Sequence, residues 1–263
     1  MEQLQLSVRG VNYAYNKEKP VLRGIDAEFS SGRLTGLLGP NGSGKTTLLR
    51  QLTGGIKPDQ GEILLNGSPI ATLRPRELAR KMALVPQRAE IAFDYTALDV
   101  VLMGRQPFLS RFQRESEADI ELARRAMRRF DVLPLSERRA SELSGGEWQR
   151  VCLARAICQG AGVLLLDEPV SSLDIRHQID TLRLLNRLAR EEGVCCVCVL
   201  HDLNLAAHFC DELYVLHAGS VYAAGPPEKI LTASLAEEVY GIEAQVARDA
   251  AGRIRLDPTY REI

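Results

Sequence analysis

The sequence GPNGSGKT occupies residues 39–46 and directly follows the apolar stretch LTGLL at residues 34–38. It fits the pattern G-x-x-x-x-G-K-[ST], which is meaningful when it lies between a buried strand and a helix. The glycines let successive backbone N–H groups turn toward one anion, and the start of the helix adds partial positive charge. Residues 39–46, which we call the phosphate loop, therefore predict binding of a nucleoside triphosphate. An accidental glycine turn is the alternative.

Two side chains of the phosphate loop have specific expected roles. We expect Lys45 to reach the β- and γ-phosphates and Thr46 to place its hydroxyl on Mg²⁺, because that ion prefers a shell of oxygen ligands. By itself the pattern indicates only a nucleotide and its metal. The residues expected to surround the nucleotide here are Gly39, Pro40, Asn41, Gly42, Ser43, Gly44, Lys45, Thr46 and Thr47.

Two adjacent carboxylates follow another apolar stretch, in VLLLDEP at residues 163–169. Ligands of open α/β folds lie at the carboxyl edge of the sheet, where this strand would deliver Asp167 and Glu168. We expect Asp167 to hold the Mg²⁺ shell and Glu168 to orient or deprotonate an attacking water. A plain surface carboxylate is the alternative for Glu168, and its position next to Asp167 argues against it.

A second glycine-containing helix start lies in LSGGEWQR, residues 143–150. Ser144, Gly145 and Gly146 precede apolar residues at helical spacing, and a helix N-terminus binds anions. Two such sites in one chain make sense if they face different nucleotides, or the same nucleotide from different subunits.

Together, GPNGSGKT, LSGGE and VLLLDEP resemble the nucleotide-binding subunit of an ATP-binding cassette (ABC) transporter, and the resemblance covers nearly the whole chain. It implies an ATPase that uses ATP and Mg²⁺ and works as a homodimer. Each ATP would lie between the phosphate loop of one copy and residues 143–147 of the other, which we call the signature segment. The positions carried over to the second contact are Ser144, Gly145, Gly146 and Glu147.

The resemblance also implies roles for residues outside these motifs. Tyr15 matches the aromatic residue that stacks on adenine, with Tyr13 as the lesser candidate. Gln87 matches a glutamine that touches Mg²⁺ and senses the membrane subunit, and His201 matches a histidine aimed at the γ-phosphate. The D-loop, residues 172–174, matches a segment that crosses the dimer interface through Asp174.

Two residues depart from the family pattern, and three histidines carry no signal. Glu147 stands where many relatives have Gln, a change frequent in related importers, and nothing in the sequence accounts for Trp148. A γ-phosphate contact is not expected of His177, His208 or His217.

The apolar pattern predicts an α/β fold with a mainly parallel sheet. The continuously apolar stretches at residues 34–38, 163–167 and 194–201 are typical of buried parallel strands, whereas the alternation from Leu4 to Tyr15 indicates antiparallel strands. Residues 88–142 are interpreted as a helical insertion, because EADIELARRAMRRF places four apolar residues on one face and its arginines off it. We expect one nucleotide-binding domain over residues 1–263, with a C-terminal extension over about 226–263.

Composition excludes several classes of protein. The 33 Lys and Arg residues nearly balance the 34 Asp and Glu residues, so no net positive field favours nucleic acid. The longest apolar run, Val194–Leu200, is too short to cross a bilayer. The first ten residues lack a secretory pattern, so the six cysteines are expected to be reduced. CCVC at residues 195–198 is interpreted as core strand rather than a metal site.

GRQPFL, LDIRHQ, HDLNLAA and AAGPPEKILT resemble the subgroup that serves iron-siderophore, haem and cobalamin importers. The resemblance implies an ATPase that powers import of a metal chelate, with a ferric siderophore first and haem or cobalamin next. Its partners would be integral-membrane permease subunits and, indirectly, a substrate-binding protein, and its place the cytoplasmic face of the cell membrane. An exporter ATPase and a non-transport ABC machine remain alternatives, whereas a P-loop GTPase or kinase leaves LSGGE unexplained.

Overall fold

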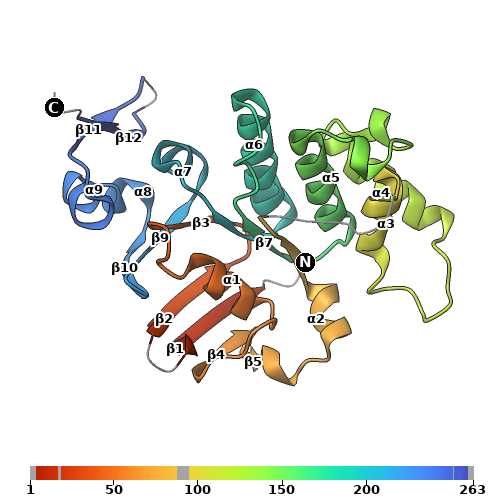
Figure 1. The fold of residues 1–263 in the computed structure, drawn as a ribbon, viewed down its shortest axis with the longest axis horizontal. Helices are drawn as coiled ribbons and strands as arrows, with labels where there is room; N and C mark the ends of the chain where they lie inside the picture. The colour runs from red at the N-terminus through yellow and green to blue at the C-terminus, as the bar shows by residue number, and fades with distance from the viewer. Residues whose placement is uncertain (1–3, 17–18, 88–94, 251, 260–263) are drawn as a thin grey trace.

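The computed structural model describes residues 4–16, 19–87, 95–250 and 252–259, and its centre is a six-stranded sheet (Figure 1). The strand order is β10-β9-β3-β8-β7-β6. All neighbouring pairs are parallel except β9 and β10, which pair antiparallel. The predicted α/β fold with a mainly parallel sheet is therefore confirmed. The strands are β3 (Leu34–Leu38), β6 (Met82–Val85), β7 (Val163–Asp167), β8 (Cys195–Val199), β9 (Glu212–His217) and β10 (Ser220–Gly225).

The N-terminal part forms a separate antiparallel sheet in the order β2-β1-β4-β5. Leu6 and Val8 of β1 are buried, as the alternating pattern predicts, and Ser7 between them is buried as well. Helix α1 (Lys45–Leu52) contacts both sheets through β2 and β7. The phosphate loop therefore leads into a helix that is packed in place. The elements are β1 (Gln5–Asn16), β2 (Lys19–Ser30), β4 (Gln60–Leu65), β5 (Ser68–Pro69), η1 (Ile70–Thr72) and α2 (Pro75–Lys81).

Helices gather at one end of the molecule, on the right of Figure 1, where α3 and α4 pack against α5. Ala123, Met127 and Phe130 of the expected apolar face are buried, whereas Arg128 and Arg129 pair at the surface with Glu121 and Glu192. The helical insertion is thus present from Ala97 onward, and residues 88–94 lie outside the described residues. The elements are α3 (Ala97–Leu102), η2 (Met103–Arg105), α4 (Glu117–Arg129), η3 (Leu133–Leu135), η4 (Ala140–Glu142) and α5 (Gly145–Cys158).

The C-terminal part contains more regular structure than the sequence predicted. A two-stranded hairpin follows two short helices, and Asn204 of α7 fixes it by exchanging two hydrogen bonds of 3.0 and 2.9 Å with the backbone of Leu256. This contact joins residues 52 positions apart, which local patterns do not reveal. The elements are α6 (Ile175–Glu192), α7 (Leu203–Phe209), α8 (Pro227–Ile230), α9 (Ala233–Tyr240), β11 (Ala244–Arg248) and β12 (Ile254–Pro258).

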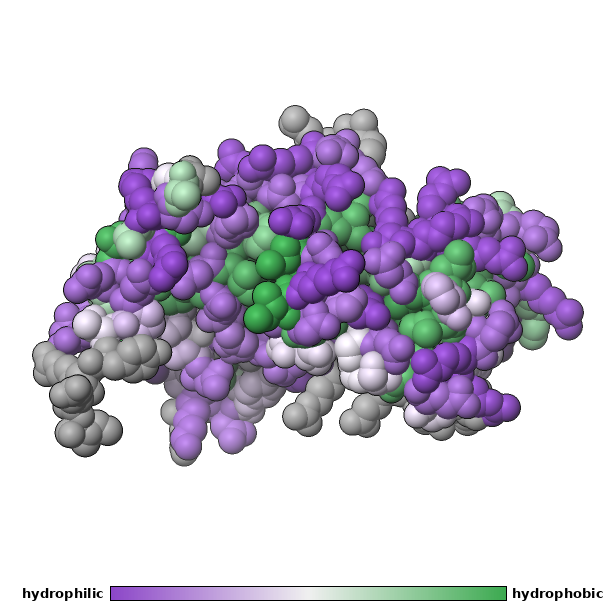
Figure 2. Space-filling model, turned by 90° about the horizontal axis from the view of Figure 1, so that it is seen from above, coloured by the Kyte–Doolittle hydropathy of each residue, from purple (hydrophilic) through white to green (hydrophobic). Residues whose placement is uncertain are grey.

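The cysteines belong to the core. All six are buried free thiols, and Cys195, Cys196 and Cys198 lie within β8, so the interpretation of CCVC as core strand is confirmed. Burial raises the pKa of the Cys195 thiol to about 12, which keeps it protonated and unreactive at neutral pH. The face shown in Figure 2 is mainly hydrophilic, with smaller hydrophobic areas among the polar side chains. Within the described ranges, no helix combines the length and the apolar composition needed to cross a membrane.

Candidate functional site

The phosphate loop adopts backbone conformations that require glycine. Gly39 and Gly44 have φ of 139° and 105°, where residues with a side chain are strained. A Cβ on Gly39 would lie 2.1 Å from the carbonyl oxygen of Leu216, so the backbones approach too closely for any other residue. Gly44 is the N-cap of α1, whose first N–H groups have no acceptor inside the helix. The loop therefore presents free backbone donors at a helix N-terminus, as the sequence predicts.

Lys45 is buried and held by the phosphate loop itself. Its Nζ donates hydrogen bonds to the carbonyl oxygens of Gly39 and Pro40, at 2.7 and 3.0 Å. Burial lowers the pKa of Lys45, and the nearby Glu168 and Asp167 oppose that shift by favouring the charged form. Neutral carbonyl oxygens offset only part of the cost of burying the charged ammonium group. Lys45 would therefore strongly stabilise an anion bound beside it.

The loop borders a polar hollow of about 380 Å³ that also reaches Val21, Gln87 and Glu168. Ser43 Oγ is buried there and has no hydrogen-bond partner in the described part of the chain, which a phosphate oxygen could provide. Tyr15 is 55% exposed, and its hydroxyl lies 3.4 Å from Thr47 Oγ1. The exposed ring therefore stands at the mouth of the hollow, where the resemblance places adenine.

Thr46 and Asp167 come together from distant parts of the sequence. Thr46 Oγ1 lies 3.4 Å from Asp167 Oδ1 at the carboxyl end of β7. Burial raises the pKa of Asp167, the Thr46 hydrogen bond opposes that shift, and the neighbouring Glu168 adds to it. A hydroxyl and a carboxylate beside the hollow that the phosphate loop borders fit the oxygen preference of Mg²⁺, which these two residues would hold.

Glu168 receives contacts from both other residues expected to act in catalysis. Gln87 Nε2 donates to Glu168 Oε2 at 2.7 Å, and His201 Nε2 lies 2.5 Å from Glu168 Oε1. Three loops, after β6, β7 and β8, thus converge on one carboxylate at the sheet edge. The side chain of Glu168 is 14% exposed and that of His201 45%, so the carboxylate can reach water from a largely enclosed position.

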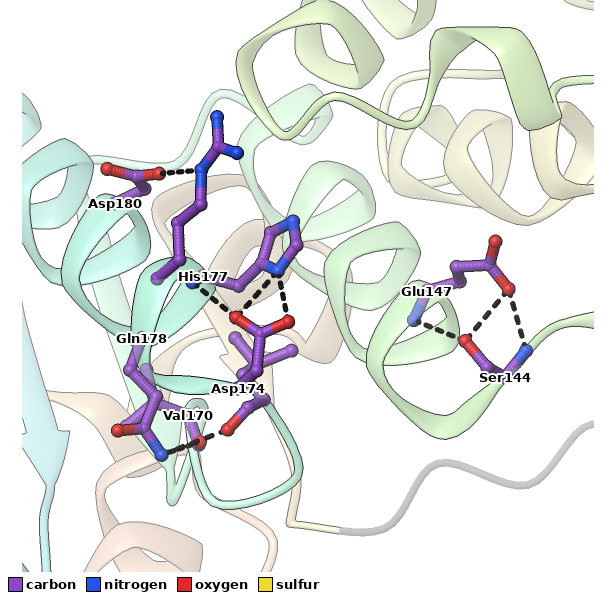
Figure 3. Close-up of polar contacts among 9 residues, drawn as sticks. Ser144, Glu147, Val170, Asp174, His177, Gln178 and Asp180 are labelled. Carbon is purple, nitrogen blue, oxygen red and sulfur yellow. Dashed lines mark hydrogen bonds and ion pairs between the residues drawn. The ribbon is translucent and has the colours of Figure 1, made fainter.

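The signature segment forms a closed helix cap (Figure 3). Ser144 is the N-cap of α5 and accepts a hydrogen bond from the Glu147 N–H, while the Glu147 carboxylate accepts from the N–H and the hydroxyl of Ser144, both at 2.8 Å. These Ser144 hydrogen bonds lower the pKa of Glu147. In this structure Glu147 therefore orders the helix start. Its expected nucleotide contact stays a prediction.

Trp148 and the two glycines of the signature segment have different surroundings. Trp148 is half-buried and packs against the core that the helical end shares with the central sheet, which accounts for a large apolar residue at this position. A Cβ on Gly145 would meet open space, and one on Gly146 would lie 3.6 Å from Leu173 and Ser172. The signature segment thus lies beside the D-loop.

His177 and Gln178 lie beside the D-loop, and the sequence did not predict a role for either in the site. Asp174 is the N-cap of α6, accepting from the His177 N–H at 2.9 Å, and its carboxylate also contacts the His177 ring (Figure 3). The His177 backbone hydrogen bond is the largest cause of the lowered pKa of Asp174. Gln178 bonds to the backbone of residues 170 and 173. The available signal was the spacing of three residues between an Asp at a helix start and a His.

Comparisons with known proteins agree with this geometry. The family model described as ABC transporter matches residues 22–171. The chain is 42% identical over 239 residues to "Cobalamin import ATP-binding protein BtuD" of Halobacterium salinarum, covering 90% of this chain and 60% of that protein. It is 44% identical over 236 residues to "Hemin import ATP-binding protein HmuV" of Bordetella avium, covering 87% of this chain and 89% of that one.

Solved structures give the same picture. A metal-chelate type ABC transporter in an inward-facing conformation matches with a TM-score of 0.84 and 28% identity, over 98% of both chains. A dimeric bacterial ABC transporter cassette matches with a TM-score of 0.76 and 26% identity, over 84% of this chain and 98% of that one. The overlap with the first structure includes the C-terminal residues that the family model leaves out.

Proposed function

Because this chain belongs to the ABC transporter family, we propose that it is an ATPase subunit that powers import of a metal chelate through a membrane permease. The observation that carries the ATPase is the convergence of Gln87 and His201 on Glu168 beside the phosphate loop. The names of the relatives carry the direction of transport. An exporter or a non-transport machine is less well supported, because the two sequence relatives reported above, at 42% and 44% identity, are both named for import.

The residues of the site divide the hydrolysis of ATP among them. Lys45 and the N–H groups of the phosphate loop would bind the β- and γ-phosphates, and Thr46 and Asp167 would hold Mg²⁺, which neutralises phosphate charge. Glu168 would accept a proton from the attacking water. Gln87 and His201 would orient the Glu168 carboxylate, and His201 would also contact the γ-phosphate.

A homodimer would complete each site. The signature segment offers a helix N-terminus with open space at Gly145, so a γ-phosphate from a second copy could approach it. Asp174, 67% exposed at the D-loop, is placed to cross the same interface. The dimeric cassette among the solved relatives supports this arrangement.

The permease would dock in an apolar hollow of about 520 Å³ between α2 and β6. β6 ends two residues before Gln87, so a segment seated there would press on the residue that contacts Glu168. Gln51 of α1 is fully buried at this hollow, and both polar atoms of its amide lack a hydrogen-bond partner within the described ranges. The hollow is lined by apolar residues such as Ile63, Ile70, Leu73, Leu78, Met82 and Leu84.

For the cargo we propose a ferric siderophore first, with haem or cobalamin next. Relatives named for hemin and cobalamin import and a metal-chelate type transporter among the structures support this chemical class. The subunit would lie at the cytoplasmic face of the membrane, held by the permease, with a substrate-binding protein delivering cargo on the other side.

Trapping the ATP-bound state tests this proposal. Tagged Glu168→Gln protein, incubated with ATP in detergent-solubilised native membranes, should co-purify with a polytopic permease identified by mass spectrometry. Lys45→Ala serves as the control, because the loss of the buried cation that contacts phosphate should abolish the ATP-dependent part of the capture. Recovery of ribosomal or DNA-repair proteins alone would refute the importer and leave the ATPase standing.

A further inference from the structure

The segment between Glu168 and Asp174 links the candidate catalytic base to the D-loop. It begins with two hydrogen bonds to the carbonyl oxygen of Glu168, which accepts from the N–H and the hydroxyl of Ser171 at 3.3 and 3.1 Å. It continues in a turn in which the N–H of Leu173 donates to the carbonyl oxygen of Val170 at 3.2 Å. Val170 and Leu173 of this segment are buried in the core, whereas Ser171, Ser172 and Asp174 are exposed, so the polar part of the segment depends on hydrogen bonds for its position.

The side chain of Gln178, near the start of α6, forms hydrogen bonds to both ends of the turn between Val170 and Leu173. Its Nε2 donates to the carbonyl oxygens of Val170 and Leu173, at 3.2 and 3.0 Å (Figure 3). The same side chain borders a small hollow of about 120 Å³ that is shared with Glu168 and His201. One amide group therefore ties the middle and the end of the segment to a helix that contacts the sheet through β3 and β8.

His177 fixes the far end of the segment. Its ring Nδ1 lies 2.9 and 2.8 Å from the two carboxylate oxygens of Asp174, and its backbone N–H donates to one of them. The ring contact therefore selects one rotamer of an otherwise exposed aspartate. Figure 3 shows the two contacts side by side, with His177 and Gln178 reaching the segment from one helix turn.

We propose that Gln178 and His177 are positioning residues for ATP hydrolysis, which set the course of residues 169–174 and thereby the placement of Glu168 and Asp174. This inference rests on the proposed ATPase function. Both side chains act through their contacts to residues 170, 173 and 174. Because both donors reach the segment from consecutive residues of one helix, movement of α6 displaces the base of one site and the interface carboxylate of the other together.

The test compares Gln178→Met, which keeps the length of the side chain and removes both donors, with the wild type. We expect kcat to fall about 10-fold, the scale for losing two hydrogen bonds, while KM for ATP stays within about twofold. Amide hydrogen exchange at residues 171–174 should accelerate. His177→Leu should act in the same direction, and His177→Gln, which retains an N–H donor for Asp174, should recover most of the rate.

Arg176→Gln is the matched control, because Arg176 lies on the same helix turn with its side chain 88% exposed. It should leave kcat and exchange unchanged. Wild-type kcat in Gln178→Met, a rise in KM alone, or an equal loss in Arg176→Gln would overturn the inference. If the wild type hydrolyses no ATP, the proposed function fails, and unchanged exchange at residues 171–174 in Gln178→Met would then still refute the positioning role.

Discussion

Glu168 has a backbone conformation that residues with a side chain rarely adopt. Its φ is 52°, in the left-handed region, and a bulky residue there costs free energy. The neighbouring Asp167 is the last residue of β7, so the chain turns sharply between the two carboxylates. This turn directs Asp167 toward Thr46 and Glu168 toward Gln87 and His201. The strain is concentrated at the residue to which we assign the proton transfer.

Replacing Glu168 by Gln should separate binding from chemistry. The amide keeps the shape of the side chain but cannot accept the water proton, so turnover should fall by at least about 10²-fold while ATP still binds. Steady-state hydrolysis and a binding isotherm with ATP measure the two quantities. Glu191→Gln, on the exposed side of α6, is the control and should hydrolyse ATP at the wild-type rate. Turnover close to wild type in Glu168→Gln would refute the assignment.

The raised pKa of Asp167 predicts an acid limit on activity. Because burial raises this pKa, Asp167 takes up its proton at a higher pH than an ordinary aspartate, whose pKa is near 3.8. The protonated form cannot bind Mg²⁺, so Mg²⁺-dependent hydrolysis should be lost on acidification while the protein is still folded. Raising the Mg²⁺ concentration should move the limit to lower pH, because the metal competes with the proton. A limit that is independent of Mg²⁺ would exclude Asp167 as its source.

Among the elements, a partly buried ion pair links three helical segments at the helical end. Arg105 Nε donates to Asp119 Oδ1 at 2.9 Å, and Arg105 also donates to the carbonyl oxygens of Cys158 and Gln159 at the end of α5. Hydrogen bonds from Ser116, followed by the one from Arg105, lower the pKa of Asp119 to about 2. The pair therefore connects η2, the first turn of α4 and the last turn of α5.

Arg105→Ala should destabilise the protein by about 3 kcal/mol, because Asp119 Oδ1 and two helix-terminal carbonyls lose the donor that Arg105 provides, while Asp119 Oδ2 keeps its hydrogen bonds from Ser116. Since the folded pKa of Asp119 is lowered, its contribution is complete above the ordinary pKa near 3.8 and disappears as the pH falls toward 2. Urea unfolding at neutral pH measures the difference. Arg124→Ala, on the exposed face of α4, should change the unfolding free energy by less than about 0.5 kcal/mol. An equal loss in both variants would remove the special role of Arg105.

At the scale of the whole molecule, the phosphate loop and the signature segment are two separate helix starts, and we propose both as anion-binding surfaces. The first starts α1 beside the central sheet, and the second starts α5 at the helical end, next to the D-loop. Each offers helix N–H groups to an anion, and the signature segment leaves open space in front of Gly145. A second copy that contributed its own phosphate loop would bring the two surfaces onto one nucleotide.

ATP should therefore convert Glu168→Gln protein from a 29.1 kDa monomer into a dimer of twice that mass, because the trapped nucleotide joins two copies. Light scattering coupled to gel filtration, with and without ATP, measures the change. Gly145→Asp places a negative charge against the incoming phosphate and should prevent dimerisation without lowering ATP affinity in the monomer. Dimers of equal amount in both variants would contradict the shared-nucleotide arrangement.

The sequence by itself determined the parts of this protein that depend on local pattern. Continuous apolar stretches predicted β3, β7 and β8, because strands covered on both faces exclude polar residues. The phosphate loop and the helix start at Ser144 were predicted as well, since glycine and cap residues act within a few positions of themselves.

Only the tertiary structure decided which distant residues meet. It brought Gln87 and His201 onto Glu168, paired Arg105 with Asp119 across two helices, and closed the C-terminal hairpin against Asn204. It also gave His177 and Gln178, to which the sequence assigned no role in the site, their contacts to the D-loop. The physical reason is that a side-chain hydrogen bond reaches about 3 Å whatever the separation along the chain, so its partner is fixed by packing of whole elements.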